Sequence, residues 1–91
     1  MPREATVAYR VTVTGRVQGV GFRAWTQWTA HRLGVNGWVK NTWAGTVDAF
    51  VEGPESAVNA LLNALETGPS MARVENIQKE RTTPQGYAGF D

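Results

Sequence analysis

The sequence predicts an α+β fold, in which two helices cover one face of a four-stranded antiparallel sheet. Three observations lead to this class: four segments have strand-like patterns, two have helical apolar spacing, and their order is β-α-β-β-α-β. Each helix needs an apolar sheet face to cover, and right-handed crossovers bring both helices to the same face. The economical arrangement is the ferredoxin-like sandwich, and the 91 residues are expected to form one domain, 1–91.

The first half of the chain predicts a strand, a loop, a helix and a second strand. Residues 6–14 alternate in the manner of a half-buried strand, and glycines at 15, 19 and 21 then indicate a loop. The apolar spacing becomes helical from Phe22 to Leu33, Gly34 suits the C-cap, and residues 35–41 form the next strand. The expected helix stripe is Phe22, Trp25, Thr29 and Leu33, and Trp25, Trp28 and Trp38 are expected in the core or on a sheet face.

The second half predicts a hairpin partner, a second helix and a last strand. Residues 46–52 alternate and are close enough to 35–41 to pair as a hairpin. Pro54 is expected at the first position of a helix that ends at Gly68-Pro69. Residues 72–81 form the last strand, with a β-bulge because Val74 and Ile77 are out of step, and 87–90 form a possible short fifth strand. The apolar stripe of the second helix is Val58, Leu61, Leu62 and Leu65.

Composition narrows the classes of function. A net charge of +1 gives no strong attraction to nucleic acid or membranes. The absence of cysteine excludes disulfides, thiolate catalysis and cysteine-ligated metals. The single histidine, His31, leaves little for a zinc or iron site, and we expect it to be solvent-exposed or to cap its helix. The N-terminal segment lacks the apolar core of a signal peptide, so a cytoplasmic location is expected.

The segment Gly15–Arg23, GRVQGVGFR, is the main candidate for a functional site. Unpaired backbone N–H groups at a helix start carry partial positive charge, and glycines let several of them converge on an anion. A phosphate group fits such a loop, and Arg23 in the first helical turn can add a bidentate contact. The alternative interpretation is that the glycines only form a tight turn.

Two well-known phosphate motifs do not account for this loop. Gly19-x-Gly21-x-x-Ala24 formally matches the dinucleotide fingerprint, but the acidic residue expected about 20 positions later is missing. The chain is also too short for a two-halved dinucleotide fold, and the Gly-Lys-Ser/Thr ending of a P-loop is absent. These observations argue against dinucleotide binding and against nucleoside triphosphate chemistry.

Two segments, GRVQGVGFR at 15–23 and GWVKN at 37–41, closely resemble the paired signatures of the acylphosphatase family. The resemblance continues through GWVKNTWAGTVDAFVEG and covers nearly the whole chain. It implies a ferredoxin-like fold and hydrolysis of the carboxyl–phosphate bond of acyl phosphates, which gives a carboxylate and inorganic phosphate. It also implies that the reaction needs no metal, no cofactor and no covalent phosphoenzyme.

The resemblance further implies which residues form the site. Arg23 and Asn41 are the expected catalytic pair: the loop backbone and Arg23 bind the phosphate, and Asn41 positions the attacking water. The expected partners are a small acyl phosphate and inorganic phosphate, with no nucleic acid and no membrane, and the expected state is a monomer. The expected phosphate-binding residues are Arg16, Val17, Gln18, Gly19, Val20, Gly21, Phe22 and Arg23.

The chain departs from the family pattern in two places. Ala44-Gly45 replaces the usual Asp-Gly, which removes a turn-favouring acid and is expected to loosen the hairpin. The chain ends at GYAGFD where many members have a longer last strand, which leaves the length of that strand open. Beside the expected site, Trp43 is interpreted as an exposed loop aromatic, with shielding of the acyl group as the alternative.

Two hypotheses of a binding module compete with that of an enzyme. Ferredoxin-like sheets also form RNA-recognition domains, but the basic-aromatic strand motif of those domains is missing from this sequence. A non-catalytic phosphate- or carbamoyl-phosphate-binding module of the same fold stays open, because acylphosphatase-like domains also occur in hydrogenase-maturation proteins. Release of phosphate from a simple acyl phosphate separates an enzyme from such a module.

Overall fold

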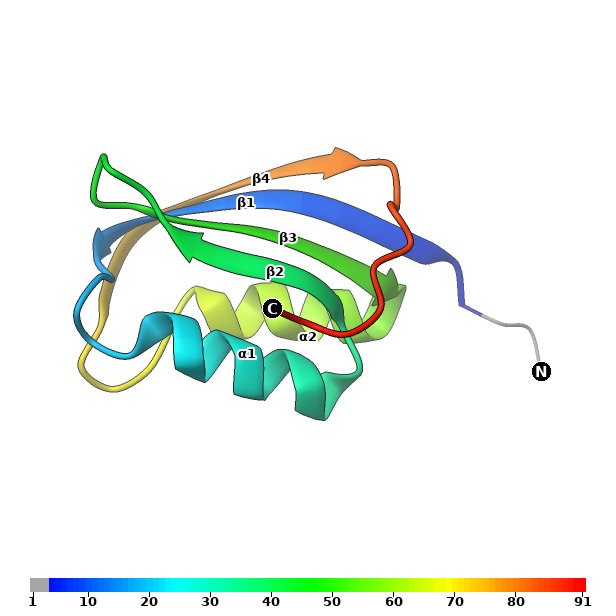
Figure 1. Cartoon of the computed structure of the whole chain (residues 1–91), viewed down its shortest axis with the longest axis horizontal. Helices are drawn as coiled ribbons and strands as arrows, with labels where there is room; N and C mark the ends of the chain where they lie inside the picture. Colours follow the sequence, from blue (N-terminus) through cyan, green and yellow to red (C-terminus); the bar gives the residue numbers. More distant parts are fainter. Residues whose placement is uncertain (1–3) are drawn as a thin grey trace.

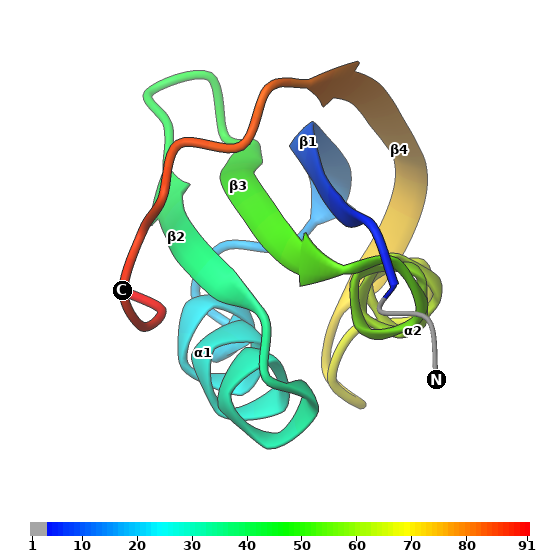
Figure 2. The same ribbon diagram turned by 90° about the vertical axis from the view of Figure 1, so that its right-hand side faces the viewer.

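The computed structural model describes residues 4–91 as two layers, a sheet and a pair of helices (Figure 1). The elements are β1 (Thr6–Arg16), α1 (Phe22–Leu33), β2 (Asn36–Asn41), β3 (Val47–Pro54), α2 (Glu55–Leu65) and β4 (Arg73–Thr82). The sheet order is β2-β3-β1-β4, and all neighbouring strands are antiparallel. Figure 2 shows both helices on the same face of the sheet, which confirms the predicted ferredoxin-like sandwich.

The hydrophobic core lies between the sheet and the helices. Alternate residues of the two central strands face it, because successive side chains of a strand point to opposite faces. The predicted stripe of α2 is completely buried. The main core residues are Val7, Val11 and Val13 of β1, Val47, Ala49 and Val51 of β3, and Val58, Leu61, Leu62 and Leu65 of α2.

Helix α1 covers the sheet with a different set of residues from the predicted stripe. Thr26 and Ala30 are buried beside Phe22 and Thr29, whereas Trp25 is only half-buried. The expectation for Trp28 is wrong, because its side chain is 58% exposed. At 3.6 residues per turn Trp28 lies about 120° around the helix from Phe22, and therefore outside the buried face. The Arg32 guanidinium covers its ring instead, 4.6 Å from the centroid.

The end of β1 differs from the prediction, which placed a loop from Gly15 onwards. The strand continues to Arg16, and its pairing with β4 shifts by one residue between Thr14 and Gly15. Glu75 is the extra residue of β4, so the predicted bulge is confirmed, and Val74 and Ile77 both pack on the core. Gly15 (φ 130°) is required by this close pairing, because a Cβ there would lie 2.1 Å from the Arg73 carbonyl oxygen.

The start of α2 also needs one correction. Pro54 is the N-cap residue, so the helix begins one position later than predicted, at Glu55. The first turn is held by the N-terminal segment: the Glu4 carboxylate accepts hydrogen bonds from the Ser56 hydroxyl and the Ser56 N–H, each 2.8 Å. Both hydrogen bonds lower the pKa of the Glu4 carboxyl, and the one from the Ser56 hydroxyl has the larger effect.

The C-terminal segment crosses the outer face of the sheet from β4 to the edge strand β2 (Figures 1 and 2). The buried Glu52 carboxylate of β3 holds it by accepting the N–H groups of Gln85 (2.6 Å), Gly86 (3.2 Å) and Tyr87. The expected fifth strand is reduced to a single parallel bridge between Phe90 and Gly37. Phe90 is nevertheless buried in the core, so this segment completes the fold.

We expect Glu52→Ala to release the C-terminal segment. Three N–H groups lose a charged acceptor that is 4% exposed, which should reduce the free energy of unfolding by about 2–3 kcal/mol. Urea unfolding measures this change, and amide hydrogen exchange at residues 85–87 should accelerate. Glu80→Ala, at an exposed position of β4, is the matched control and should change stability by less than about 0.5 kcal/mol. Equal stabilities of the two variants would contradict this role of Glu52.

Candidate functional site

The glycine loop, residues 17–21, joins the end of β1 to the start of α1. Its two ends are fixed because the side chains of Val17 and Phe22 are each only 1% exposed. Between them the chain takes left-handed conformations at Gly19 (φ 73°) and Gly21 (φ 78°). No other atom lies within 4 Å of where a Cβ would stand at either position, so these glycines keep the loop surface open.

The N-terminus of α1 is open to an anion. Gly21 is its N-cap residue, no side chain caps the helix, and its first turn contains no acidic residue. The first backbone N–H groups of a helix have no partner within it and carry partial positive charge. Within residues 4–91, the N–H groups from Gly19 to Ala24 donate to no backbone carbonyl. This helix start can therefore bind a negatively charged group.

Asn41 lies on a different element from the loop, because it is the exposed last residue of β2. The turn that follows it is closed by hydrogen bonds from the Thr42 N–H to the Thr46 carbonyl (3.0 Å) and from the Gly45 N–H to the Thr42 carbonyl (3.2 Å). The two threonine hydroxyl oxygens also lie 2.8 Å apart. The turn is thus closed with Ala44 in place of an acid, and the expected loosening stays a prediction.

The side chain of Gln18 joins the glycine loop to this turn. Its Nε2 donates to the carbonyl oxygens of Thr42 and Thr46, both at 2.8 Å. Sequence reasoning gave Gln18 only a phosphate-binding role and missed this link. No local pattern signals it, because the partners are 24 and 28 residues away along the chain.

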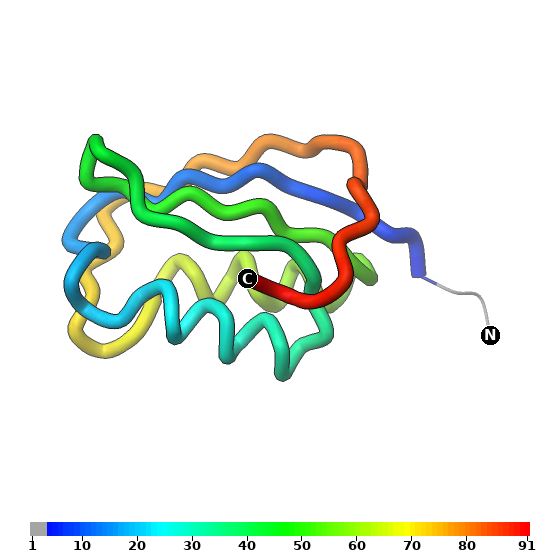
Figure 3. Tube along the Cα trace, in the orientation of Figure 1, coloured from blue at the N-terminus to red at the C-terminus, as the bar shows by residue number. Residues whose placement is uncertain are grey.

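The loop, Arg23 and Asn41 surround one depression of about 270 Å³, called the phosphate depression below. Its lining contains five of the eight expected phosphate-binding residues together with Asn41, and adds Ala24. Arg16, Gln18 and Val20 are not part of this lining. Figures 1 and 3 show the glycine loop and the β2–β3 turn at the same end of the molecule. The lining residues are Val17, Gly19, Gly21, Phe22, Arg23, Ala24 and Asn41.

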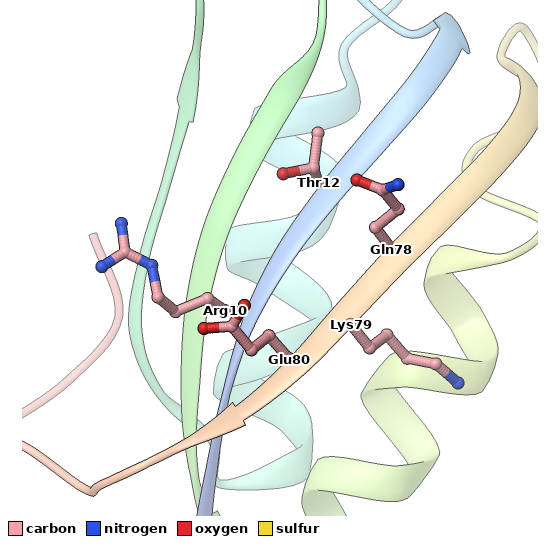
Figure 4. Close-up of a pocket in the computed structure, with 5 residues that line it drawn as sticks. All are labelled: Arg10, Thr12, Gln78, Lys79 and Glu80. Carbon is pink, nitrogen blue, oxygen red and sulfur yellow. The ribbon is translucent and has the colours of Figure 1, made fainter.

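A larger depression of about 530 Å³ lies on the outer face of β1 and β4 (Figure 4). It is lined by Arg10, Thr12, Gln78, Lys79 and Glu80. Figure 4 shows Lys79 directed away from the other four side chains and Arg10 extended across β3. These side chains do not converge on a common point, so this surface is a poor candidate for a reaction site.

Several residues outside the phosphate depression were singled out by the sequence. Trp43 is fully exposed, as expected for a loop aromatic, and His31 is exposed while its Nε2 lies 3.2 Å from the Phe90 carbonyl. Trp38 packs on the outer face of the sheet, stacked on Phe50 at 6.5 Å. In the described part of the chain, no three His, Asp or Glu side chains form a metal-binding group, and no helix is long and apolar enough to cross a membrane.

The sequence and the fold were both compared with those of known proteins. The family model Acylphosphatase matches residues 9–91. An acylphosphatase from Pseudomonas paraeruginosa is 48% identical over 86 residues, 94% of this chain and 94% of that protein. The crystal structure of acylphosphatase from Bacillus subtilis has a TM-score of 0.90 at 38% identity and covers 92% of this chain and 94% of that chain. Full-length HypF in the phosphate- and nucleotide-bound form gives 0.87 at 29% identity, over 94% of this chain and 11% of that chain.

The fold defines an α+β sandwich, and a glycine loop at one end of its sheet leads into an uncapped helix start. Because the family model spans most of the chain and relatives are about half identical over most of their length, the chain belongs to the acylphosphatase family. It is accordingly an enzyme, as the resemblance implied.

We expect Gln18→Glu to detach the turn from the glycine loop. The substitution keeps the size of the side chain but replaces two N–H donors by an oxygen that faces two carbonyls. The free energy of unfolding should fall by about 2 kcal/mol, and amide hydrogen exchange in 42–46 should accelerate. Gln78→Glu, at an exposed position of β4, is the control and should leave both measurements nearly unchanged. Normal exchange in 42–46 of the Gln18 variant would show that the turn is held without it.

Proposed function

We propose that this chain hydrolyses the carboxyl–phosphate bond of acyl phosphates, without a metal, by in-line attack of a water molecule. In this proposal the glycine loop and Arg23 hold the phosphoryl group, Asn41 orients the water, and residues 1–91 act as one domain. The observation that supports it is the common lining of the phosphate depression by the loop, Arg23 and Asn41. Action as a monomer in the cytoplasm stays a prediction from the sequence.

The chemistry of the leaving group suits a site with few ionisable side chains. An acyl phosphate releases a carboxylate, whose parent acid has a pKa of roughly 4. Such a group leaves without being protonated, so no general acid is needed. The reaction then requires that the phosphoryl group and the water be positioned in line, and that the charge of the transition state be stabilised.

The loop and Arg23 supply positive charge where the transition state needs it. In phosphoryl transfer the transition state is largely loose, and its charge spreads over three equatorial oxygens. In this proposal the uncapped N–H groups at the start of α1 donate to such oxygens, and the exposed Arg23 guanidinium binds two of them at once. The glycines allow the oxygens to approach the backbone without meeting a Cβ.

Asn41 is the group in the phosphate depression that is suited to hold the water. Its amide offers both an acceptor and donors, and it stands on a different element from the loop. The Gln18 bonds to the turn fix the end of β2 relative to the loop, which favours a defined line of attack. The loop and Arg23 alone would form a phosphate-binding site, and Asn41 would turn it into a hydrolase.

We expect Arg23→Ala to lower kcat/KM for benzoyl phosphate by about 10³-fold or more, the scale of arginines that act in other phosphoryl transfers. Arg32→Ala is the matched control, because it removes the same charge from the last turn of the same helix. It should retain activity within about twofold. Near-normal turnover by a folded Arg23→Ala protein would overturn the role of Arg23.

Asn41→Ala is expected to lower kcat by roughly 10²–10³-fold, the scale for one positioned polar group, and to leave phosphate binding largely intact. Inhibition by inorganic phosphate checks this, since its inhibition constant should stay close to that of the wild type. Asn63→Ala, at an exposed position of α2, is the control. A wild-type kcat in the Asn41 variant would show that another group orients the water.

A non-catalytic phosphate- or carbamoyl-phosphate-binding module is the second candidate. It is supported by the similarity to 11% of full-length HypF, which shows that a unit of this size occurs inside a much larger protein. The two candidates differ in a single assay: release of inorganic phosphate from benzoyl phosphate in the presence of EDTA. Turnover supports the enzyme, and phosphate binding without turnover supports the module.

A further inference from the structure

Two arginines stand opposite each other beside the glycine loop. Arg16 is the last residue of β1, Arg73 is the first residue of β4, and they are Cα partners in the antiparallel register. Directly opposed residues of an antiparallel pair project from the same face, with Cβ atoms about 4.5–5.5 Å apart. Both side chains are exposed. The sheet therefore presents two positive charges side by side at one end.

Nothing acidic lines the surface that these arginines share. They border a depression of about 400 Å³, called the arginine depression below, together with Ser70, Met71 and Ala72. Within the described chain no Asp or Glu belongs to this lining. Like charges directly opposite each other on neighbouring strands are destabilising, so the pair costs stability unless an anion neutralises it.

The arginine depression is linked to the phosphate depression through two consecutive residues of the chain. Arg16 is followed directly by Val17, which lines the phosphate depression. The segment after α2 packs against Phe22, which also lines the phosphate depression. A Cβ at Gly68 would lie 2.7 Å from the Phe22 ring. Figures 1 and 3 show this segment and the glycine loop at the same end of the molecule. The two depressions thus flank one loop.

We propose that Arg16 and Arg73 form a second anion subsite, which binds a carboxylate or phosphate group at the far end of the acyl chain. The inference rests on the proposed function, since the substrate is placed by its phosphoryl group in the phosphate depression. Guanidinium groups bind such oxyanions in bidentate fashion. The enzyme accordingly prefers acyl phosphates that carry a second negative charge over uncharged acyl phosphates of the same length.

Butyryl phosphate and succinyl phosphate test this preference, because their acyl chains have equal length and differ in one terminal carboxylate. The measured quantity is the ratio of kcat/KM for succinyl phosphate to that for butyryl phosphate. In Arg73→Gln this ratio should fall about threefold to fivefold, the scale of an exposed ion pair. The fall should appear in KM, and it should disappear at high salt.

Arg81→Gln is the matched control, because it removes the same charge from the other end of β4 and should leave the ratio unchanged. Butyryl phosphate turnover should stay within about twofold in Arg73→Gln, and its thermal unfolding midpoint should equal or exceed that of the wild type. An unchanged ratio in Arg73→Gln, or an equal fall in Arg81→Gln, would overturn the subsite.

A failure of the proposed function can be distinguished from a failure of the subsite. If the wild type hydrolyses neither substrate, the hydrolase assignment fails, and binding then decides on the subsite. Calorimetry would compare butylphosphonate with 4-phosphonobutyrate, which differ in the same terminal carboxylate. Tighter binding of 4-phosphonobutyrate by the wild type, lost in Arg73→Gln, would support the subsite, and equal binding of both compounds would overturn it.

Discussion

The position of the candidate site depends on one side-chain amide, that of Gln18. The glycine loop and the β2–β3 turn are both exposed connections, and each is anchored to the core only at its ends. Among the hydrogen bonds of residues 4–91, those from Gln18 to Thr42 and Thr46 are the ones that join them. Arg23 follows the glycine loop in the first turn of α1, and Asn41 directly precedes the β2–β3 turn. The separation of these two residues is therefore set by this link. In the proposed metal-free reaction no central ion organises the site, so its geometry must come from such contacts.

The hydrophobic core also fixes the position of the glycine loop. Glycines make the loop open to an anion, but they also give it conformational freedom that a binding site must restrict. Val17 and Phe22 restrict it, because their buried side chains pin both ends of the loop to the core. Gly68 extends the same support, since its lack of a Cβ lets the segment after α2 close on the Phe22 ring. The open backbone of the loop and its fixed position therefore have separate causes.

The sequence predicted the features that depend on neighbouring residues. Alternation and helical spacing gave the six elements to within one or two residues at most of their ends, and the mismatch of Val74 and Ile77 predicted the bulge. Contacts between distant segments left no such pattern. The burial of Glu52 by the C-terminal segment and the link from Gln18 to the turn join residues more than 20 positions apart.

The site residues illustrate the same limit. The family resemblance suggested Arg23 and Asn41, and the fold brings both to one depression, but it places Arg16 in another. Arg16 was expected in the loop because Gly15 was interpreted as the loop's first residue. Gly15 instead serves the close pairing of β1 with β4, so the strand continues and Arg16 faces Arg73. Whether a glycine forms a loop or permits close strand pairing depends on which atoms approach it, and only the folded structure shows those atoms.

The distribution of charge explains how a nearly neutral chain can attract a small anion. A net charge of +1 gives little long-range attraction. Fields between exposed charges are screened within about 10 Å, so a small anion responds to the charges around it and not to the total. Arg16, Arg23 and Arg73 lie around one loop, next to the positive end of α1. The fold brings together the end of β1, the start of β4 and the start of α1, and thus produces a local field that composition does not reveal.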